Sequence, residues 1–320
     1  MMNYLNTYRR YACDIGRINA EARSDAASLV EMTEDIYNHD LGWIAEQVLE
    51  TNSARHVILL SGPSSSGKTT TSKKLADAFR HHGVDVQLIS MDNFYLGAEF
   101  VRKLPNGKPD FECVEALDIP LIKQSIEKLT TTGSCVIPKY DFAGSRRSDQ
   151  TETIHLADNS VIIMEGIHAL NPIFSEGQSK AKVMKVYTAV KQGIKDNEDY
   201  VLTNREIRFI RRIVRDYYFR KVDPEYMIAM WDTVVEGEKQ YIRPYRYTSD
   251  FTVNSIHIYE PCIMKEKAVP ILSSISPSNP HYAFVQRLVE ALERFETIDS
   301  RLVPENSLMR EFIGGGCYTY

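Results

Sequence analysis

Residues 62–69 are the part of the sequence whose types and spacing most clearly indicate chemistry. They read Gly-Pro-Ser-Ser-Ser-Gly-Lys-Thr and match the pattern G-x-x-x-x-G-K-[ST]. Glycines let backbone N–H groups turn toward anionic oxygens, and a helix that starts here adds a favourable dipole. We expect Lys68 to reach the β- and γ-phosphates of ATP or a close relative, and the Thr69 hydroxyl to bind Mg²⁺. The predicted phosphate-binding residues are Gly62, Pro63, Ser64, Ser65, Ser66, Gly67, Lys68, Thr69 and Thr70.

Two acidic residues follow apolar runs that are typical of buried strands. Asp92 comes after residues 84–90, and Glu165 comes after residues 161–164. Ligands of doubly wound sheets bind at the carboxyl ends of the strands. Asp92 is therefore placed to deprotonate an acceptor hydroxyl, although an Asp-Asn pair is also typical of a turn, and both interpretations stay open. We expect Glu165 to be the carboxylate associated with Mg²⁺.

Residues 205–221 are rich in arginine. Arg208, Arg211, Arg212 and Arg215 recur at spacings of three and four, so they share one face of a helix. Packed cations repel one another unless anions are near, and a lid that closes on ATP would bring such anions. A solvated basic face is the alternative. The aromatic residues at 217–219 are expected to belong to the core.

The elements that position these residues alternate along the chain. Apolar runs predict strands at residues 57–61, 84–90, 161–164, 183–190 and 251–256. Helical spacing predicts helices at 68–80, 120–131, 204–221, 224–240 and 280–296, with helices also in residues 1–55 and an irregular tail at 300–320. The predicted fold is α/β, a doubly wound parallel sheet. We divide it into a helical N-terminal extension at 1–55, a core with a lid at 56–275, and a C-terminal helix and tail at 276–320.

Composition narrows the class of protein. The 320 residues carry 38 Lys plus Arg and 43 Asp plus Glu, a formal net charge of −5, which argues against a nucleic acid as partner. The five cysteines form no C-x-x-C pair, which favours free thiols in a reducing compartment. No signal peptide or membrane span is expected, so we predict a cytoplasmic protein. The sequence is compatible with a homo-oligomer.

Several motifs, taken together and in order, resemble the uridine kinase / phosphoribulokinase family of P-loop kinases, in its bacterial-type uridine kinase-like branch. Besides the phosphate-binding motif they are Met-Asp-Asn-Phe-Tyr at 91–95, Pro-Lys-Tyr-Asp-Phe at 138–142, Ile-Met-Glu-Gly-Ile-His at 163–168, and the segments 211–217, 237–245, 254–255 and 306–315. Longer members of this branch carry synthetase-like modules upstream. Residues 1–55 look similar to the helical junction that follows those modules, and this chain would then be a shortened form.

The resemblance implies an ATP- (or GTP-) and Mg²⁺-dependent kinase that acts on a small molecule, with a nucleoside as the expected substrate. It implies that Asp92 is the general base and that the arginine-rich helix is the lid, with Arg212 touching the acceptor. It also implies that Glu112 holds the ribose hydroxyls and that Tyr140 and Phe142 flank the base. The implied catalytic residues are Asp92, Lys68, Arg208 and Arg212, and the donor is also bound by Arg211 and Arg215.

One position departs from the family pattern. Uridine kinases have a histidine that reads the pyrimidine edge shortly after Tyr-Asp-Phe, whereas Ser145 stands at the matching place here. A site that loses hydrogen-bonding groups loses discrimination. Uridine, phosphorylated at its 5′-hydroxyl, leads as the acceptor, with cytidine beside it. Another nucleoside or a small sugar phosphate is one alternative, and a nucleotide-binding regulatory or RNA-associated protein is another.

Overall fold

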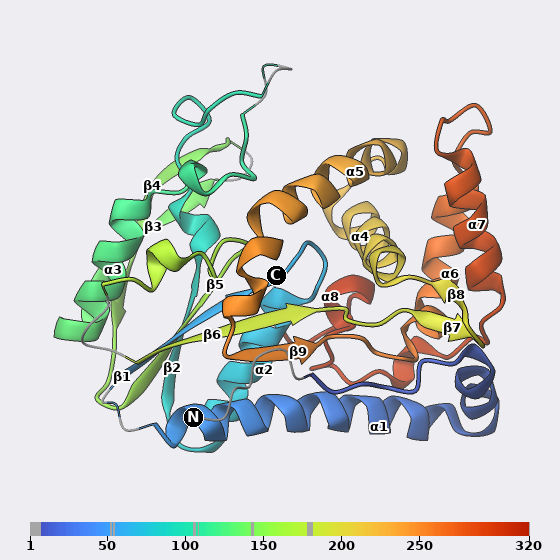
Figure 1. Ribbon diagram of the computed structural model, residues 1–320, viewed down its shortest axis with the longest axis horizontal. Helices are drawn as coiled ribbons and strands as arrows, with labels where there is room; N and C mark the ends of the chain where they lie inside the picture. Colours follow the sequence, from blue (N-terminus) through green and yellow to red (C-terminus); the bar gives the residue numbers. More distant parts are fainter. Residues whose placement is uncertain are drawn as a thin grey trace.

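A five-stranded parallel sheet forms the centre of the molecule (Figure 1). The computed structural model describes residues 8–51, 53, 55–104, 107, 109–141, 144–177 and 182–319. The strands lie in the order β2-β5-β1-β6-β9, and every neighbouring pair is parallel. This confirms the predicted fold class and the five predicted strands. Their bounds are β1 Arg55–Ser61, β2 Asp85–Ser90, β5 Ser160–Glu165, β6 Lys182–Ala189 and β9 Phe251–Asn254.

Helices cover both faces of this sheet because successive strand residues point to opposite sides. Val57 and Leu59 of β1 face helix α3 (Ile119–Thr132) in one buried cluster. Ile58 and Leu60 face the other way, into a larger cluster with helices α1 (Ile15–Leu49) and α2 (Lys68–His81). Strands buried on both faces explain why β1 and β5 are continuous apolar runs rather than alternating ones.

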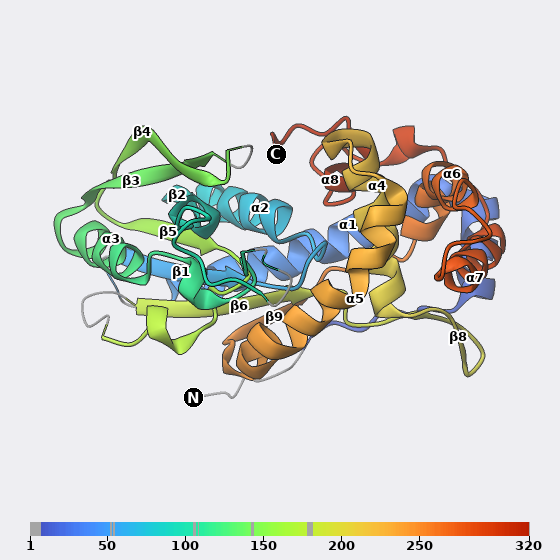
Figure 2. The same cartoon turned by 90° about the horizontal axis from the view of Figure 1, so that it is seen from above.

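The remaining helices lie around one end of the sheet. Helices α4 (Asn204–Arg220) and α5 (Pro224–Tyr241) lie between the sheet and the pair α6 (Glu260–Ser273) and α7 (Tyr282–Glu293), which stands at the end of the molecule opposite α3 (Figures 1 and 2). The helices predicted at 204–221, 224–240 and 280–296 are thereby confirmed. No helix in the described part of the chain is long and apolar enough to cross a bilayer.

Three features were absent from the sequence-based prediction. Two are antiparallel hairpins, β3 (Ser134–Asp141) with β4 (Arg146–His155), and β7 (Ile194–Asp196) with β8 (Asp199–Leu202). Their strands are polar on the exposed side or only a few residues long, so they give little apolar pattern. The third is α6, whose apolar and charged residues do not separate onto opposite faces and which contains Pro270, and both properties hide a helical period.

Both ends of the chain pack onto the same core. The long helix α1 runs along the lower edge of the molecule in Figure 1, and its Tyr37 hydroxyl lies 2.7 Å from the Thr71 hydroxyl of α2. The tail was predicted to be irregular, which is wrong in part. It contains the short helix α8 (Arg310–Ile313), and Leu308 and Phe312 are fully buried. The proposed division at residues 55 and 275 stays a prediction.

A buried carboxylate joins these two ends. Glu34 of α1 accepts hydrogen bonds from the hydroxyls of Tyr259 at 2.6 Å and Ser307 at 2.5 Å, and it lies 3.3 Å from His257. Burial alone would raise the pKa of Glu34, but His257 and the two hydroxyls outweigh burial and lower that pKa to about 2. The ionised carboxylate therefore holds the N-terminal helix, the end of the sheet and the tail together.

Replacing this carboxylate tests its role in stability. We expect Glu34→Ala to lower the free energy of unfolding by about 2–4 kcal/mol, because buried hydroxyls and His257 lose their acceptor. Urea denaturation at pH 7 measures the change. Glu31→Ala is the matched control, since Glu31 is an exposed residue of the same helix. Equal stability of the two variants would contradict this role.

Candidate active site

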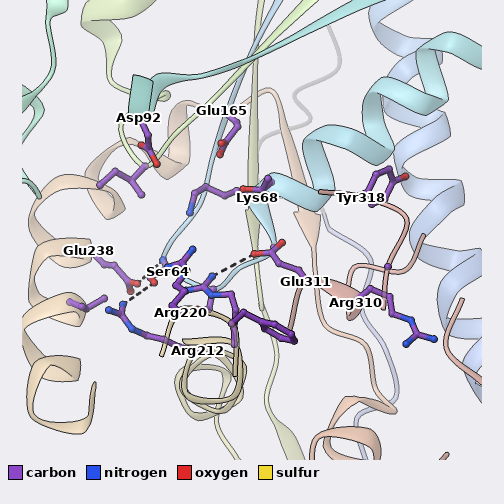
Figure 3. A pocket seen from close by; sticks show the side chains of 18 of the residues that line it. Ser64, Lys68, Asp92, Glu165, Arg212, Arg220, Glu238, Arg310, Glu311 and Tyr318 are labelled. Atoms are coloured by element: carbon purple, nitrogen blue, oxygen red, sulfur yellow. Dashed lines mark hydrogen bonds and ion pairs between the residues drawn. The ribbon is translucent and has the colours of Figure 1, made fainter. Parts of the chain in front are cut away.

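A cavity of about 690 Å³ opens at the carboxyl ends of the strands. Its walls come from the loop after β1, from helices α4 and α5, and from the C-terminal tail (Figure 3). Its volume is in the range of pockets that hold nucleotide-sized ligands. The polar residues lining it are Ser64, Ser65, Lys68, Thr69, Asp92, Tyr95, Glu112, Glu165, Arg212, Arg215, Arg220, Glu238, Arg310, Glu311 and Tyr318.

The phosphate-binding loop has the backbone that its motif requires. A Cβ at Gly62 would lie 2.0 Å from the Thr188 carbonyl oxygen, so only glycine fits there. Gly67 has a φ of +83° and immediately precedes α2, which begins at Lys68. The hydroxyls of Ser65 and Ser66 are buried and have no hydrogen-bond partner among the described residues. Unpaired donors in a loop of this shape fit an anionic ligand.

Lys68 lies between this loop and two carboxylates. Its ammonium donates to the Pro63 carbonyl at 3.2 Å, and Asp92 and Glu165 lie on its other side (Figure 3). Burial raises the pKa of Asp92, and Lys68 opposes that rise. Burial, followed by the neighbouring charge of Asp92, raises the pKa of Glu165 to about 7. Two carboxylates held close in a buried site therefore bind a proton more tightly than exposed carboxylates do.

The local sequence explains how these carboxylates are placed. β2 and β5 are neighbours in register, so Ser90 stands opposite Glu165 at the ends of the two strands. The Ser90 hydroxyl donates to Glu165 at 3.1 Å and also accepts from the Asp92 amide at 3.3 Å, which starts a short 3-10 turn. One serine thus orients both acidic residues.

These residues also fit a magnesium ion. Among the described residues no group of three His, Cys, Asp or Glu side chains could hold a metal by itself. Mg²⁺ commonly uses one or two protein oxygens and takes the rest from phosphates and water. The Thr69 hydroxyl and Glu165, which both line the cavity, supply oxygens of that kind.

The arginines of α4 divide into two groups. Arg212 and Arg215 line the cavity, together with Arg220 at the end of the helix. The Arg212 guanidinium donates to the Ser64 hydroxyl at 3.0 Å, so it reaches the phosphate-binding loop directly. All three arginines lie near Asp216, at 3.5 Å or less. Burial lowers the pKa of Arg212, and Asp216 opposes that effect.

Arg208 and Arg211 are paired with carboxylates, and the predicted roles of Arg208 in catalysis and of Arg211 in donor binding stay predictions. Arg211 is fully buried, and its guanidinium bonds Glu260 at 2.6 and 2.9 Å. Arg208 bonds Glu238 of α5 at 2.5 Å. Neither lines the cavity. Each is held by a buried carboxylate and so fixes α4 to its surroundings, and Arg211 also donates to the Ser65 carbonyl of the phosphate-binding loop at 3.4 Å.

The predicted acceptor residues are only partly brought together. Glu112 lines the cavity, where burial raises its pKa and Arg212 opposes that rise. Tyr140 and Ser145 do not line it. The Tyr140 hydroxyl donates to the Leu96 carbonyl at 3.4 Å, and Ser145 is a turn residue with a φ of +49°. Phe142 lies outside the described residues.

Several cavity residues were not predicted, among them Glu238, Glu311, Arg220 and Phe219. Glu238 accepts from the Ser64 amide at 3.0 Å, and Glu311 accepts from the Thr70 hydroxyl at 2.6 Å. Arg220 and Phe219 complete this side of the cavity. Phe219 was expected to be core but is 52 % exposed. Glu238 and Glu311 belong to motifs that carried the family resemblance, and the excess of arginine on α4 was a second signal, because buried cations require anions.

The raised pKa of Glu165 has a measurable effect on stability. Between its ordinary pKa of 4.5 and about 7, the folded protein holds the Glu165 proton more tightly than the unfolded chain does. Stability from this group is therefore lost as pH rises through that window. Without Mg²⁺ or nucleotide, we expect Glu165→Gln to raise the Tm by about 2–4 °C at pH 8. The difference should shrink toward pH 5.

Differential scanning fluorimetry across pH 5–8 provides this measurement. Glu176→Gln is the control, since Glu176 is an exposed residue that does not line the cavity. A Tm difference between wild type and Glu165→Gln that stays constant with pH would contradict the account of Glu165.

Comparison with known proteins identifies the family of this chain. Uridine kinases of Lactobacillus helveticus and Macrococcus caseolyticus are each 30% identical over 198 residues, which is 62% of this chain and 85% and 86% of theirs. A solved structure described as a possible uridine kinase from Bacillus stearothermophilus aligns with a TM-score of 0.39 and 21% identity, over 47% of this chain and 79% of that one. The model of the phosphoribulokinase / uridine kinase family matches residues 57–259. The chain belongs to the phosphoribulokinase / uridine kinase family of P-loop kinases.

Proposed function

We propose that this protein transfers the γ-phosphoryl group of ATP to a hydroxyl of a nucleoside, with uridine and its 5′-hydroxyl as the leading acceptor. One observation carries the proposal. Asp92 and Glu165 lie across a single cavity from Arg212 and Arg220, with Lys68 between the two groups (Figure 3), and Arg215 lines the same cavity. A base, a metal-associated carboxylate and clustered cations around one space are the parts that phosphoryl transfer needs.

The proposed reaction uses these parts as follows. Asp92 accepts the proton of the acceptor hydroxyl, whose oxygen forms a bond to the γ-phosphorus. The bond from that phosphorus to the β–γ bridging oxygen breaks, and ADP leaves. Lys68, Arg212 and Arg215 stabilise the negative charge on the moving group. The raised pKa of Asp92 makes this carboxylate a better proton acceptor than an exposed aspartate would be. Mg²⁺, when bound near Thr69 and Glu165, neutralises phosphate charge.

The negative charges in the part of the cavity proposed to bind the acceptor favour an uncharged acceptor over a phosphorylated one. Glu112 and Glu238 line the cavity on this side, and a buried carboxylate readily accepts hydrogen bonds from a ribose diol. A phosphorylated sugar would have to place its second phosphate beside these carboxylates, with Arg212 as the nearby cation. The names of the curated relatives also support a nucleoside.

Another nucleoside is the second candidate. Tyr140 and Ser145, which stand where the family places its base-contacting residues, lie outside the cavity lining. A site with few groups that read the base edge discriminates weakly between bases. Turnover of cytidine, adenosine and guanosine beside uridine distinguishes a selective enzyme from a permissive one.

Substitution of the proposed base tests the mechanism. We expect Asp92→Asn to lower kcat with uridine by about 10²–10⁴-fold, because the amide cannot take the hydroxyl proton. The affinity for MgATP should change by less than about threefold, since no phosphate contact is removed. Steady-state kinetics by coupled detection of ADP, together with calorimetric MgATP binding, measure the two quantities.

Asp85→Asn serves as the control, since Asp85 is an exposed residue at the start of the same strand. Full turnover by Asp92→Asn would contradict the assignment of Asp92 as the general base. Loss of MgATP binding in that variant would show that Asp92 supports the donor instead.

A further inference from the structure

The C-terminal segment 310–318 forms one wall of the active-site cavity, although it lies outside the residues that match the family model. That match ends at residue 259, whereas Arg310, Glu311, Gly314, Gly315, Gly316 and Tyr318 all line the cavity. Figure 3 shows Glu311, Arg310 and Tyr318 on the side of Lys68 away from Asp92. The proposed phosphoryl transfer occurs at the Asp92 side, so the tail faces the other end of the donor.

The segment is hydrogen-bonded to the rest of the protein near both of its ends. Arg310 donates to the carbonyls of Pro304, Ser300 and Gly314 at 3.3, 3.2 and 3.1 Å. The Tyr318 hydroxyl donates to Asp77 of α2 at 2.6 Å, and Lys73 of the same helix donates to the Thr319 carbonyl. The tail is thus held by hydrogen bonds at both ends. A wall that is already ordered in the free protein costs no ordering entropy when a ligand binds.

Its contact with α2 places it beside the end of the phosphate-binding loop. The side chain of Leu308 lies against Gly67, where a Cβ would come within 2.5 Å of it. Glu311 accepts from the Thr70 hydroxyl at 2.6 Å and lies 3.6 Å from Arg215. The cavity therefore passes from the phosphate-binding residues directly to Gly314, Gly315 and Gly316.

The surface at that point combines an aromatic ring with free backbone groups. Phe219 lines the cavity and is 52 % exposed, and its ring edge would lie 2.7 Å from a Cβ at Gly314. Within the described part of the chain, the backbone N–H and C=O groups of Gly315 and Gly316 make no hydrogen bond to protein. An apolar ring face beside backbone groups that are free to hydrogen-bond a ligand suits a flat heterocycle with a polar edge.

We propose that residues 310–318, together with Phe219, form the subsite for the nucleoside part of the nucleoside triphosphate donor. The base stacks on Phe219, and its polar edge faces the backbone of Gly315 and Gly316. This inference rests on the proposed kinase function. It adds that a segment beyond the family core recognises the donor, while the phosphate-binding loop holds only the phosphates.

Calorimetry with two probes separates the nucleoside from the phosphates. Full-length protein is titrated with MgADP and with magnesium pyrophosphate, which lacks the nucleoside. We expect the wild type to bind MgADP about tenfold or more tighter than pyrophosphate, and Phe219→Ala to reduce that ratio by about tenfold, as expected for loss of one base–aromatic stack. Pyrophosphate affinity should stay within about twofold. Tyr217→Ala is the matched control, since Tyr217 is an exposed aromatic of the same helix that does not line the cavity.

An unchanged ADP-to-pyrophosphate ratio in Phe219→Ala, or no preference for ADP in the wild type, would overturn this subsite. Hydrogen exchange on the unmodified protein provides a test that needs no variant. MgADP should slow exchange at the amides of residues 315–318, and pyrophosphate should not. Equal effects of the two probes would also overturn the inference. Absence of acceptor turnover with an intact ADP preference would contradict the proposed kinase function and leave the donor subsite standing.

Discussion

The ion pair between Arg211 and Glu260 is the interaction on which the rest of the site depends. Both side chains are almost completely removed from solvent, and their oxygens and nitrogens lie 2.6–2.9 Å apart. A buried charge costs several kcal/mol unless a partner and further hydrogen bonds compensate it. Arg211 satisfies this condition with Glu260 and with the Ser255 carbonyl at 2.7 Å. The pair therefore fixes α4 against the start of α6.

Arg211 and Arg208 are paired with carboxylates of the protein, whereas Arg212, Arg215 and Arg220 of α4 line the cavity. Arg212 and Arg215 have Asp216 and Glu311 near them, but the loop hydroxyls of Ser65 and Ser66 remain without partners among the described residues. The opposite wall carries Asp92 and Glu165, whose pKa values burial raises. In the free protein, the positive charges of one cavity wall and the negative charges of the other are therefore only partly balanced by neighbouring residues. Under the proposed function, a bound nucleotide with its metal would supply the missing charges, and this would couple binding to catalytic readiness.

Sequence patterns predicted the parts of the fold whose periodicity is strong. The five strands of the sheet are apolar runs ended by turn residues, and α4 has a clear amphipathic period. The hairpin β3–β4 was not predicted because β4 is largely polar, and α6 was not predicted because its apolar and charged residues are not separated onto opposite faces. Both elements lack the contrast between an apolar and a polar face by which sequence patterns identify strands and helices.

The residues of the site likewise divide into those that the sequence predicts and those that it does not. Asp92, Glu165, Glu112 and the phosphate-binding residues were predicted from motifs. The three acidic residues line the cavity, as do Ser64, Ser65, Gly67, Lys68 and Thr69 of the predicted residues 62–70. Spacing alone could not separate Arg211 from Arg212, because the two residues differ only in which carboxylate the tertiary fold brings to each. The same holds for Phe219 and the glycines of the tail. Their place at the cavity depends on residues about a hundred positions apart in the chain.

Identification of the reaction product tests the central claim most directly. Wild-type protein is incubated with ATP, Mg²⁺ and uridine, and the products are resolved by phosphorus NMR and mass spectrometry. The account predicts equal amounts of ADP and a nucleoside monophosphate that carries its phosphate on the 5′-oxygen. Release of inorganic phosphate without a phosphorylated nucleoside, with uridine or with any other neutral nucleoside offered, would contradict it.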